Sequence, residues 1–208
     1  MLLAVSRESR NKEEKTVSKT TNILIAGVGG QGTLLASRIL GHVFISEGHD
    51  VKVSEVHGMS QRGGSVVTYV KYGEKVESPV ICKGEADFLI SFELCETARW
   101  LPYLKKDGIV VTSTQKTNPM PVIMGVKEYP SDIEEKIKAL GINLMSADAL
   151  GLAEKCGTSK AANVVLIGMF AKHSELPKEV FVKAVEECVP EKTRSINLAA
   201  FEAGYSLD

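Results

Sequence analysis

The connection between the second and third apolar runs of this chain constrains its fold more than any other feature. Residues 22–26 (NILIA), 51–56 (VKVSEV) and 65–72 (SVVTYVKY) have the apolar or alternating patterns that predict strands. Only residues 57–64, with the sequence HGMSQRGG, join the second strand to the third. Neighbouring parallel strands need a crossover of about a dozen residues, usually a helix. The third strand is therefore expected to pair antiparallel or to lie elsewhere in a mixed sheet.

The rest of the chain alternates apolar runs with helical periodicity, which is typical of a layered α/β fold. The expected helices cover residues 33–47, 93–104, 131–140, 148–155, 161–173, 178–188 and 193–205. Further strands are expected at residues 76–82, 87–91, 109–113, 122–128 and 142–146. These elements predict a single three-layer α/β/α domain with a mixed, mostly parallel sheet. We expect residues 1–20, which are mostly polar or charged, to form a disordered tail, and residues 21–208 to form the domain.

The composition argues against a nucleic-acid-binding protein and against a membrane-spanning one. The chain has 208 residues, of which 44% are hydrophobic and 25% charged, and a formal net charge of -1. The longest basic run is Lys105 and Lys106, which is far less than phosphate-backbone binding usually displays. The longest strongly apolar run, residues 164–171, is much shorter than the roughly 20 residues that span a bilayer. We therefore expect a cytoplasmic protein without nucleic-acid or membrane partners.

The cysteines do not form a ligand pattern. The chain has four cysteines, none of which form a CxxC pair or a regular spacing: Cys82, Cys95, Cys156 and Cys188. A disulfide framework, a structural zinc site and an iron-sulfur cluster all need such a pattern. We expect four small buried side chains in a reducing compartment.

The sequence GVGGQG at residues 27–32 places Gly27, Gly29 and Gly32 in a GxGxxG pattern between a strand and a helix. Glycines there allow a tight turn, and the free N–H groups and positive end of the helix attract an anion. Glu55 follows Gly32 by 23 residues, near where a ribose-binding carboxylate stands in a dinucleotide site. The pattern alone is compatible with an NAD site, another anion site or a tight connection without a ligand. The missing crossover helix weakens the NAD interpretation.

The second loop, HGMSQRGG, follows a strand at the same edge of the predicted sheet, so both loops are expected to line one crevice. The guanidinium group of Arg62 suits a carboxylate or a phosphate, or is solvated on a surface loop. His57 is more readily a hydrogen-bonded structural residue than a catalytic one. Because the sequence contains no GxSxG, Walker A or HExxH motif, no catalytic residue is assigned.

Together the two loops resemble the gamma-type domain of the 2-oxoacid:ferredoxin oxidoreductases. The matching stretches are GVGGQGTLLASRIL (27–40), EVHGMSQRGGSVVTYVKYG (55–73), ADFLISFELCETARWLPYLKKDGIVV (86–111), ANVVLIGMFAK (162–172) and INLAAFEAGY (196–205). The resemblance covers nearly everything after residue 21. The combination of GGQG with HGMSQRGG is far more specific than either motif alone.

The resemblance implies a subunit that carries no cofactor itself and completes the active-site cleft of a larger subunit holding thiamine diphosphate and iron-sulfur clusters. The implied reaction converts an aryl pyruvate such as indolepyruvate and coenzyme A into an aryl-acetyl-CoA, carbon dioxide and reduced ferredoxin. The chain agrees, since it has neither clustered cysteines nor a GDG thiamine motif. We expect it to be inactive alone, and its self-association when isolated stays open.

The resemblance places the candidate cleft at the two loops and assigns no metal ligand in this chain. The candidate residues are Gly27, Gly29, Gly30, Gln31, Gly32, His57, Ser60, Gln61, Arg62, Gly63 and Gly64. Coenzyme A is a candidate shared substrate, and ferredoxin is reached through the complex. Whether the loops contact coenzyme A, the 2-oxoacid or only the partner is left open. The alternative function is an independent Rossmann-like nucleotide-binding module or an NAD-dependent dehydrogenase.

Overall fold

The computed structural model of the protein describes residues 20–57 and 63–207. Its strands are β1 (Thr20–Val28), β2 (Asp50–His57), β3 (Ser65–Gly73), β4 (Ala86–Ser91), β5 (Leu104–Ser113) and β6 (Asn143–Ala147). Its helices are α1 (Thr33–Ser46), α2 (Leu94–Trp100), α3 (Met120–Ile123), α4 (Ile133–Ala139), α5 (Ala149–Lys155), α6 (Ala162–Lys172), α7 (Lys178–Cys188) and α8 (Arg194–Tyr205). Except for Thr20, the expected tail lies outside the described residues.

The strands form one sheet in the order β2-β3-β1-β4-β5-β6. β3 pairs antiparallel with both β1 and β2, whereas β1, β4, β5 and β6 pair parallel with their neighbours in that series. The short connection at residues 57–64 is therefore sufficient, because it joins two antiparallel neighbours. The prediction of a mixed, mostly parallel sheet is confirmed.

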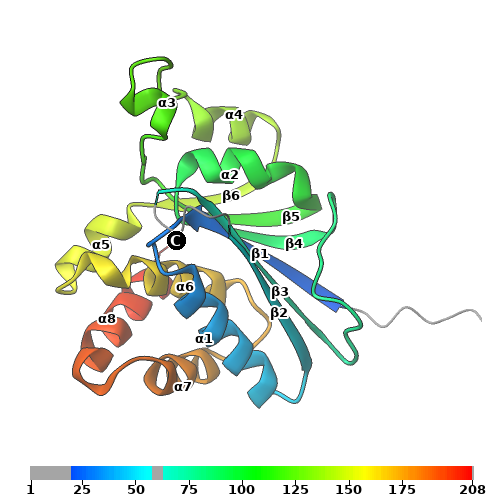
Figure 1. The fold of residues 1–208 in the computed structure, drawn as a ribbon. Helices are drawn as coiled ribbons and strands as arrows, with labels where there is room; N and C mark the ends of the chain where they lie inside the picture. The colour runs from blue at the N-terminus through cyan, green and yellow to red at the C-terminus, as the bar shows by residue number, and fades with distance from the viewer. Residues whose placement is uncertain (1–19, 58–62, 208) are drawn as a thin grey trace, which may run out of the picture.

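Helices cover both faces of this sheet, as Figure 1 shows. Helices α1, α6, α7 and α8 lie on one face, and α2 and α4 lie on the other. The central strand β1 is buried from Asn22 to Val28, because neither of its faces is open to water. The prediction of one three-layer α/β/α domain is confirmed.

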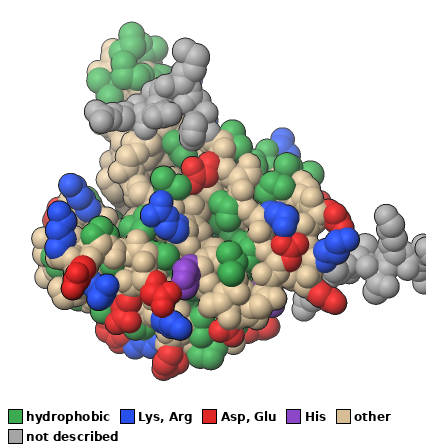
Figure 2. Space-filling model, turned by 60° about the horizontal axis from the view of Figure 1, so that its bottom comes forward, with side chains coloured by type: hydrophobic (Ala, Val, Ile, Leu, Met, Phe, Trp, Pro, Cys, Tyr) green, Lys and Arg blue, Asp and Glu red, His purple; other side chains and the backbone are tan. Residues whose placement is uncertain are grey.

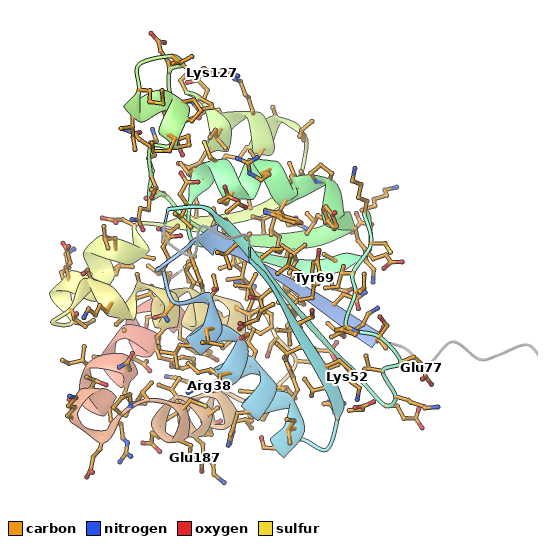
Figure 3. All side chains as sticks on the ribbon, in the orientation of Figure 1. Arg38, Lys52, Tyr69, Glu77, Lys127 and Glu187 are labelled. Carbon is orange, nitrogen blue, oxygen red and sulfur yellow. The ribbon has the colours of Figure 1, made fainter. Side chains whose placement is uncertain are left out.

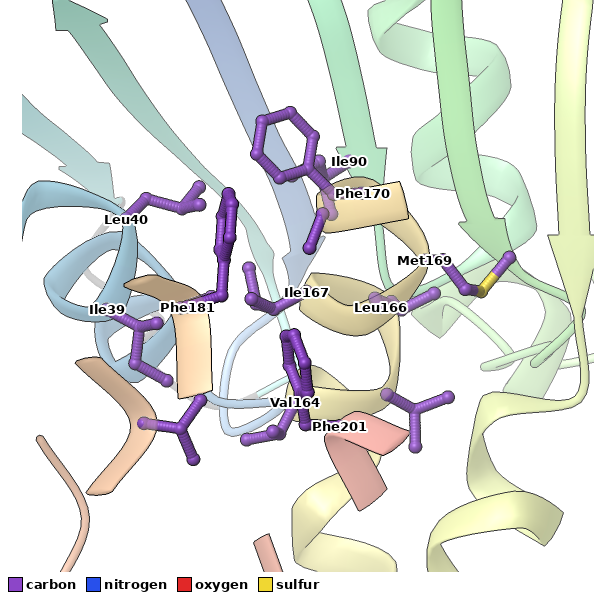
Figure 4. Close-up of a cluster of buried hydrophobic side chains, with 14 of the residues drawn as sticks. Ile39, Leu40, Ile90, Val164, Leu166, Ile167, Met169, Phe170, Phe181 and Phe201 are labelled. Atoms are coloured by element: carbon purple, nitrogen blue, oxygen red, sulfur yellow. The ribbon is translucent and has the colours of Figure 1, made fainter. Parts of the chain in front are cut away.

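Helix α6 is the centre of the larger core. Its residues from Asn163 to Ala171 are all buried, and Figure 4 shows its apolar side chains among those of α1, α7, α8 and the sheet. Burying such a side chain contributes about 1.5–3 kcal/mol. Helix α8 approaches without side chains between the backbones, because a Cβ on Gly204 would lie 1.9 Å from the carbonyl oxygen of Val165. This packing fixes α6, whose first turn reaches the carboxyl edge of the sheet.

The predicted strand at residues 76–82 is wrong. Its N–H groups bond to side chains instead of a neighbouring strand. Val76 N donates to Asp50 Oδ2 at 2.8 Å, and Cys82 N donates to Glu85 Oε2 at 2.9 Å. Pro79 removes a further donor. The segment still buries Ile81 in the smaller core, so its apolar pattern reflects burial and not strand pairing.

The predicted strand at residues 122–128 is also wrong. Its first two residues are the end of the single-turn helix α3, which Pro119 precedes, and the chain then turns at Gly125 with φ +71°. A glycine in this left-handed region marks a turn and not a strand. Val122, Ile123 and Val126 gave the segment a strand-like composition although none of them pairs in the sheet.

One boundary between a helix and a strand also differs from the prediction. Helix α2 ends at Trp100 instead of residue 104, and a 3-10 turn at Leu101–Tyr103 contains Pro102. Strand β5 then begins at Leu104. The proline removes a helical N–H donor, which explains the early end.

The described surface mixes charges of both signs. Figure 2 shows basic and acidic side chains interspersed on one face, and Figure 3 labels Arg38 on α1, Lys52 on β2, Glu77 between β3 and β4, and Glu187 on α7. Among the helices of residues 20–57 and 63–207, none has the length and apolarity that crossing a bilayer requires.

Candidate functional site

Gln31 joins three strand ends at the carboxyl edge of the sheet. The N–H of Val28, the last residue of β1, donates to Gln31 Oε1 at 2.7 Å. Gln31 Nε2 lies 3.3 Å from the carbonyl oxygen of Phe92, which follows β4, and 3.3 Å from Oε1 of Gln115, which follows β5. These bonds hold the turn between β1 and α1. Gly27 is buried beneath it, where a Cβ would lie 3.0 Å from Gln31 Oε1.

The end of the second loop lies against the first glycine loop. Gly29 N donates to the carbonyl oxygen of Gly64 at 2.9 Å, and Gly63 N donates to the carbonyl oxygen of Gly29 at 3.4 Å. Gly63 has φ +76°, a conformation that a side chain disfavours. The structure therefore brings Gly29, Gly63 and Gly64 together, backbone to backbone.

Helix α2 anchors the same end of the second loop. Ser65 follows Gly64 directly, and its hydroxyl donates to Oε2 of Glu96. Glu96 Oε1 accepts a bond from Arg99 Nε at 3.2 Å, and the Glu96 side chain is only 6% exposed. A buried carboxylate needs such partners, because desolvation without them costs several kcal/mol. Glu96 thus fixes where β3 begins.

A cavity of about 410 Å³ opens beside the first glycine loop, at the point where the chain leaves β1 and β4 in opposite directions. Such switch points are where open α/β sheets bind ligands. One wall consists of Gly30, Gln31 and Gly32, and the strand-end residues Phe92, Ser113 and Gln115 contribute its floor. Lys160, in the 3-10 turn before α6, and Asn163, in the first turn of α6, also line the cavity.

Asn163 links the first turn of α6 to the glycine loop. Its Nδ2 donates to the carbonyl oxygen of Gly32 at 3.1 Å, and its Oδ1 accepts from Val164 N at 2.9 Å. Gly32 has φ +87°, and a Cβ there would lie 2.5 Å from Asn163 Nδ2. Glycine at this position therefore permits both the turn and the close contact with α6.

The chemistry of the cavity suits an anion. Gly32 is the N-cap of the 14-residue helix α1, and no described side chain caps this helix. The free N–H groups of its first turn and the helix dipole therefore give this end of α1 a positive potential. The exposed ammonium group of Lys160 lines the same cavity. A phosphate or carboxylate here would meet backbone donors on one side and a cation on the other.

Sequence reasoning missed several of these residues. Phe92 and Gln115 follow predicted strands and Ser113 ends one, so the rule that ligands bind beyond strand carboxyl ends was a usable signal. Lys160 and Asn163 gave no comparable signal, because they reach the cavity only through the packing of α6.

Part of the predicted site cannot be placed. Ser60, Gln61 and Arg62 lie outside the described residues. The backbone of His57 ends β2 opposite Val66, and its side chain also lies outside the described part. Their assignment to a cleft stays a prediction.

The topology does not favour the dinucleotide interpretation. In a dinucleotide fold the second strand lies directly beside the first, which brings its terminal carboxylate to the ligand on the glycine loop. Here β3 lies between β1 and β2, so Glu55 is displaced by one further strand spacing of about 4.8 Å. Glu55 Oε1 instead accepts a bond from Ser37 Oγ of α1 at 3.4 Å. In the described part of the chain, no group of three or more His, Cys, Asp or Glu side chains is placed to hold a metal ion.

Comparison with known proteins places the chain in one class of protein. Residues 22–207 match the family model described as pyruvate ferredoxin/flavodoxin oxidoreductase. The indolepyruvate oxidoreductase subunit IorB of Thermococcus kodakarensis is 42% identical, with 89% of this chain and 95% of that protein covered. The subunit of the same name from Pyrococcus horikoshii is 39% identical, with the same two coverages of 89% and 95%.

Two solved structures share the fold. The gamma subunit of a keto/oxoacid ferredoxin oxidoreductase from Geobacter sulfurreducens has a TM-score of 0.67 at 23% identity, covering 89% of this chain and 96% of that one. A 2-oxoglutarate:ferredoxin oxidoreductase from Magnetococcus marinus has a TM-score of 0.68 at 16% identity, covering 90% of this chain but 31% of that one. The chain therefore belongs to the pyruvate ferredoxin/flavodoxin oxidoreductase family. Within it, the chain is an enzyme subunit, and the family resemblance that the two loops indicated is confirmed.

Proposed function

We propose that this chain is the small subunit of a 2-oxoacid:ferredoxin oxidoreductase that acts on aryl pyruvates, with indolepyruvate as the first candidate. The observation that carries the proposal is the 42% identity with an indolepyruvate oxidoreductase subunit over 95% of that protein's length. The partner is a larger subunit that carries thiamine diphosphate and iron-sulfur clusters, and ferredoxin docks on the complex. The expected cytoplasmic location and the domain limits, residues 21–208 after a tail, belong to the same proposal.

The reaction takes an aryl pyruvate and coenzyme A to an aryl-acetyl-CoA and carbon dioxide, and the electrons released reduce ferredoxin. The cofactors of the larger subunit supply the decarboxylation and electron-transfer chemistry. This chain contributes a wall of the cleft, formed by the two glycine loops at residues 27–32 and 57–64. The cavity next to Gly32 and Lys160 is the place we assign to an anionic group of coenzyme A. Support comes from its helix N-terminus, its cation and its position at the switch point of the sheet.

Reconstitution tests the subunit role. The full chain and its larger partner are mixed under anaerobic conditions with indolepyruvate, thiamine diphosphate and coenzyme A, and reduction of ferredoxin or a viologen dye is followed. Activity is expected only from the mixture, because this chain offers no redox group of its own in the proposal. A larger subunit that is fully active alone would overturn the proposal. Micromolar binding of NAD by the isolated chain, about -8 kcal/mol, would revive the dehydrogenase alternative.

A matched pair of lysine variants tests the coenzyme A assignment. Lys160→Ala in the reconstituted enzyme should raise KM for coenzyme A roughly tenfold, about 1.4 kcal/mol, and leave KM for the 2-oxoacid unchanged. Lys155 is also exposed and does not line the cavity, so Lys155→Ala serves as the control. If the two variants have equal KM values for coenzyme A, the assignment of coenzyme A to this cavity is wrong.

A further inference from the structure

Residues 118–128, which connect β5 to α4 and contain α3, form a projection with an apolar tip. Met120 is 63% exposed, Ile123 65%, Met124 69% and Val126 69%. These four are among the ten large hydrophobic side chains that are exposed in the described residues. Figure 1 shows α3 standing out from the helix layers, and Figure 3 labels Lys127 on the same projection.

The backbone of this 118–128 loop is closed on itself. The carbonyl oxygen of Pro119 accepts from Ile123 N at 3.1 Å. The carbonyl oxygen of Pro121 accepts from Val126 N at 2.9 Å and from Lys127 N at 3.0 Å. Compact loops whose ends are close and whose own groups pack together are frequently functional. The exposed side chains are therefore presented by an ordered backbone.

One buried carboxylate holds both ends of the loop. Glu93, which is 1% exposed, accepts from Thr117 N at 3.0 Å with Oε1, and the same oxygen accepts from the hydroxyl of Tyr129. Its Oε2 caps α2 by accepting from Glu96 N at 2.9 Å. The Tyr129 hydroxyl also accepts from Cys95 N at 3.2 Å, and burial with the Glu93 bond raises the pKa of Tyr129, so the hydroxyl stays a donor. The neck of the loop is thus tied to the helix that also anchors Ser65.

The loop is continuous with the edge where the cleft is proposed. A second cavity, of about 460 Å³, lies between the base of the loop and the end of the second glycine loop. Pro119, Pro121 and Val122 line one side of it, and Gly63, Gly64 and Ser65 line the other. A molecule that covers the tip and fills this cavity therefore reaches the glycine loops.

The exposure of these four apolar side chains argues for a partner that makes a contact larger than the loop itself. Exposed apolar patches of several hundred Å² on a soluble protein mark interaction sites, and one side of a standard interface is about 800 Å². The tip supplies only part of such an area, so its occupant must extend along the same edge. A partner subunit that completes the cleft extends along this edge. In the Magnetococcus marinus protein the shared fold occupies 31% of the chain, so this fold also occurs as part of a longer polypeptide.

We propose that the 118–128 loop is the docking loop of this subunit and that its apolar tip packs into an apolar hollow of the larger subunit. The inference rests on the proposed function for the existence of that subunit. Glu93 acts as a positioning residue that presents the loop, and the second cavity receives a segment of the larger subunit beside it.

Two isoleucines with nearly equal exposure provide the test. Ile123 in the tip is 65% exposed, and Ile45 near the end of α1 is 63% exposed. Ile123→Ser and Ile45→Ser are made in the full chain, and the Kd for the larger subunit is measured by calorimetry or sedimentation. Ile123→Ser should raise Kd at least tenfold, and the double variant with Met124→Ser should raise it further. Ile45→Ser should leave Kd within twofold, and all variants should keep the wild-type Tm.

The outcomes separate this inference from the function on which it rests. If the wild type binds the larger subunit and the tip variants bind equally well, the docking loop is wrong and the subunit role stands. If the wild type does not bind, the proposed function itself fails. If the isolated wild type is a dimer that Ile123→Ser dissociates, the occupant of the tip is a second copy of this chain, and the proposal is overturned in favour of self-association.

Discussion

Two regions stand at the carboxyl edge of this sheet and are built in opposite ways. The glycine turns at residues 27–32 and 63–64 meet backbone to backbone, with Gly29 N only 2.9 Å from the carbonyl oxygen of Gly64. The 118–128 loop instead carries its largest side chains on the outside, as Met124 at 69% exposure shows. Small residues allow close approach of a chain or a ligand, whereas exposed apolar ones require a cover. The same edge therefore combines a surface shaped to hold a small group with one shaped to be buried by a protein.

The first turn of α2 links the two regions. Glu96 holds Ser65 at the end of the second glycine loop, and Glu93 holds both ends of the 118–128 loop. The two carboxylates are three residues apart, and the Glu93 side chain accepts from Glu96 N, so one helix turn carries both anchors. Substitutions that destabilise one region and leave the other intact test whether the two regions are independent.

The largest effect is expected at Gly32. An Ala there must adopt φ +87°, which costs about 1–2 kcal/mol, and its Cβ would stand 2.5 Å from Asn163 Nδ2. Displacing Asn163 also breaks its bond to the carbonyl oxygen of Gly32, worth about 1 kcal/mol more. Gly32→Ala should therefore lower the free energy of unfolding by about 3 kcal/mol in a urea titration.

Gly30 is the control for that change. It has φ +103° but no atom within 4 Å of an added Cβ, so Gly30→Ala should show the backbone strain alone, about 1–2 kcal/mol. If the two variants lose equal stability, the contact between the glycine loop and α6 does not constrain the turn.

Most of the fold was predictable because its long elements carry strong periodic signals. The strand 22–26, the helix 33–47 and the short 57–64 connection together required a mixed sheet, and the structure has one. Helix 178–188 was predicted with the limits that it has, since Pro177 precedes it. The failures at residues 76–82 and 122–128 have one cause. Both segments contain apolar residues that do not belong to a paired strand. In the first segment Val76 N bonds to the distant side chain of Asp50, and in the second Val126 N and Lys127 N bond within a local turn.

The candidate site was predictable only in part. The glycines and Gln31 are local signals, because a strand, a tight turn and a helix follow one another in the sequence. Asn163 is 131 residues from Gly32, and no local pattern pairs the two. Glu93 was likewise predicted only as the first residue of a helix, since its contacts with Thr117 and Tyr129 depend on how the 118–128 loop folds back.

A smaller effect is expected at the neck of the 118–128 loop. Glu93 accepts three bonds with two oxygens, from Glu96 N, Thr117 N and the Tyr129 hydroxyl. The amide of Glu93→Gln keeps one acceptor oxygen and turns two N–H donors toward groups that also donate, so at least one buried N–H loses its partner. The loss should be about 2 kcal/mol of unfolding free energy.

The same variant should affect the 118–128 loop and leave the glycine turns unchanged. Hydrogen exchange of residues 117–129 should become faster in Glu93→Gln, whereas the amide of Gly29, bonded to Gly64, should exchange at the wild-type rate. Glu128→Gln, an exposed change in the same loop, should alter neither region. Faster exchange at Gly29 as well would mean that the two regions open as one unit. In that case the 118–128 loop would be a part of the glycine-lined site, and its apolar tip could not be treated as a separate docking element.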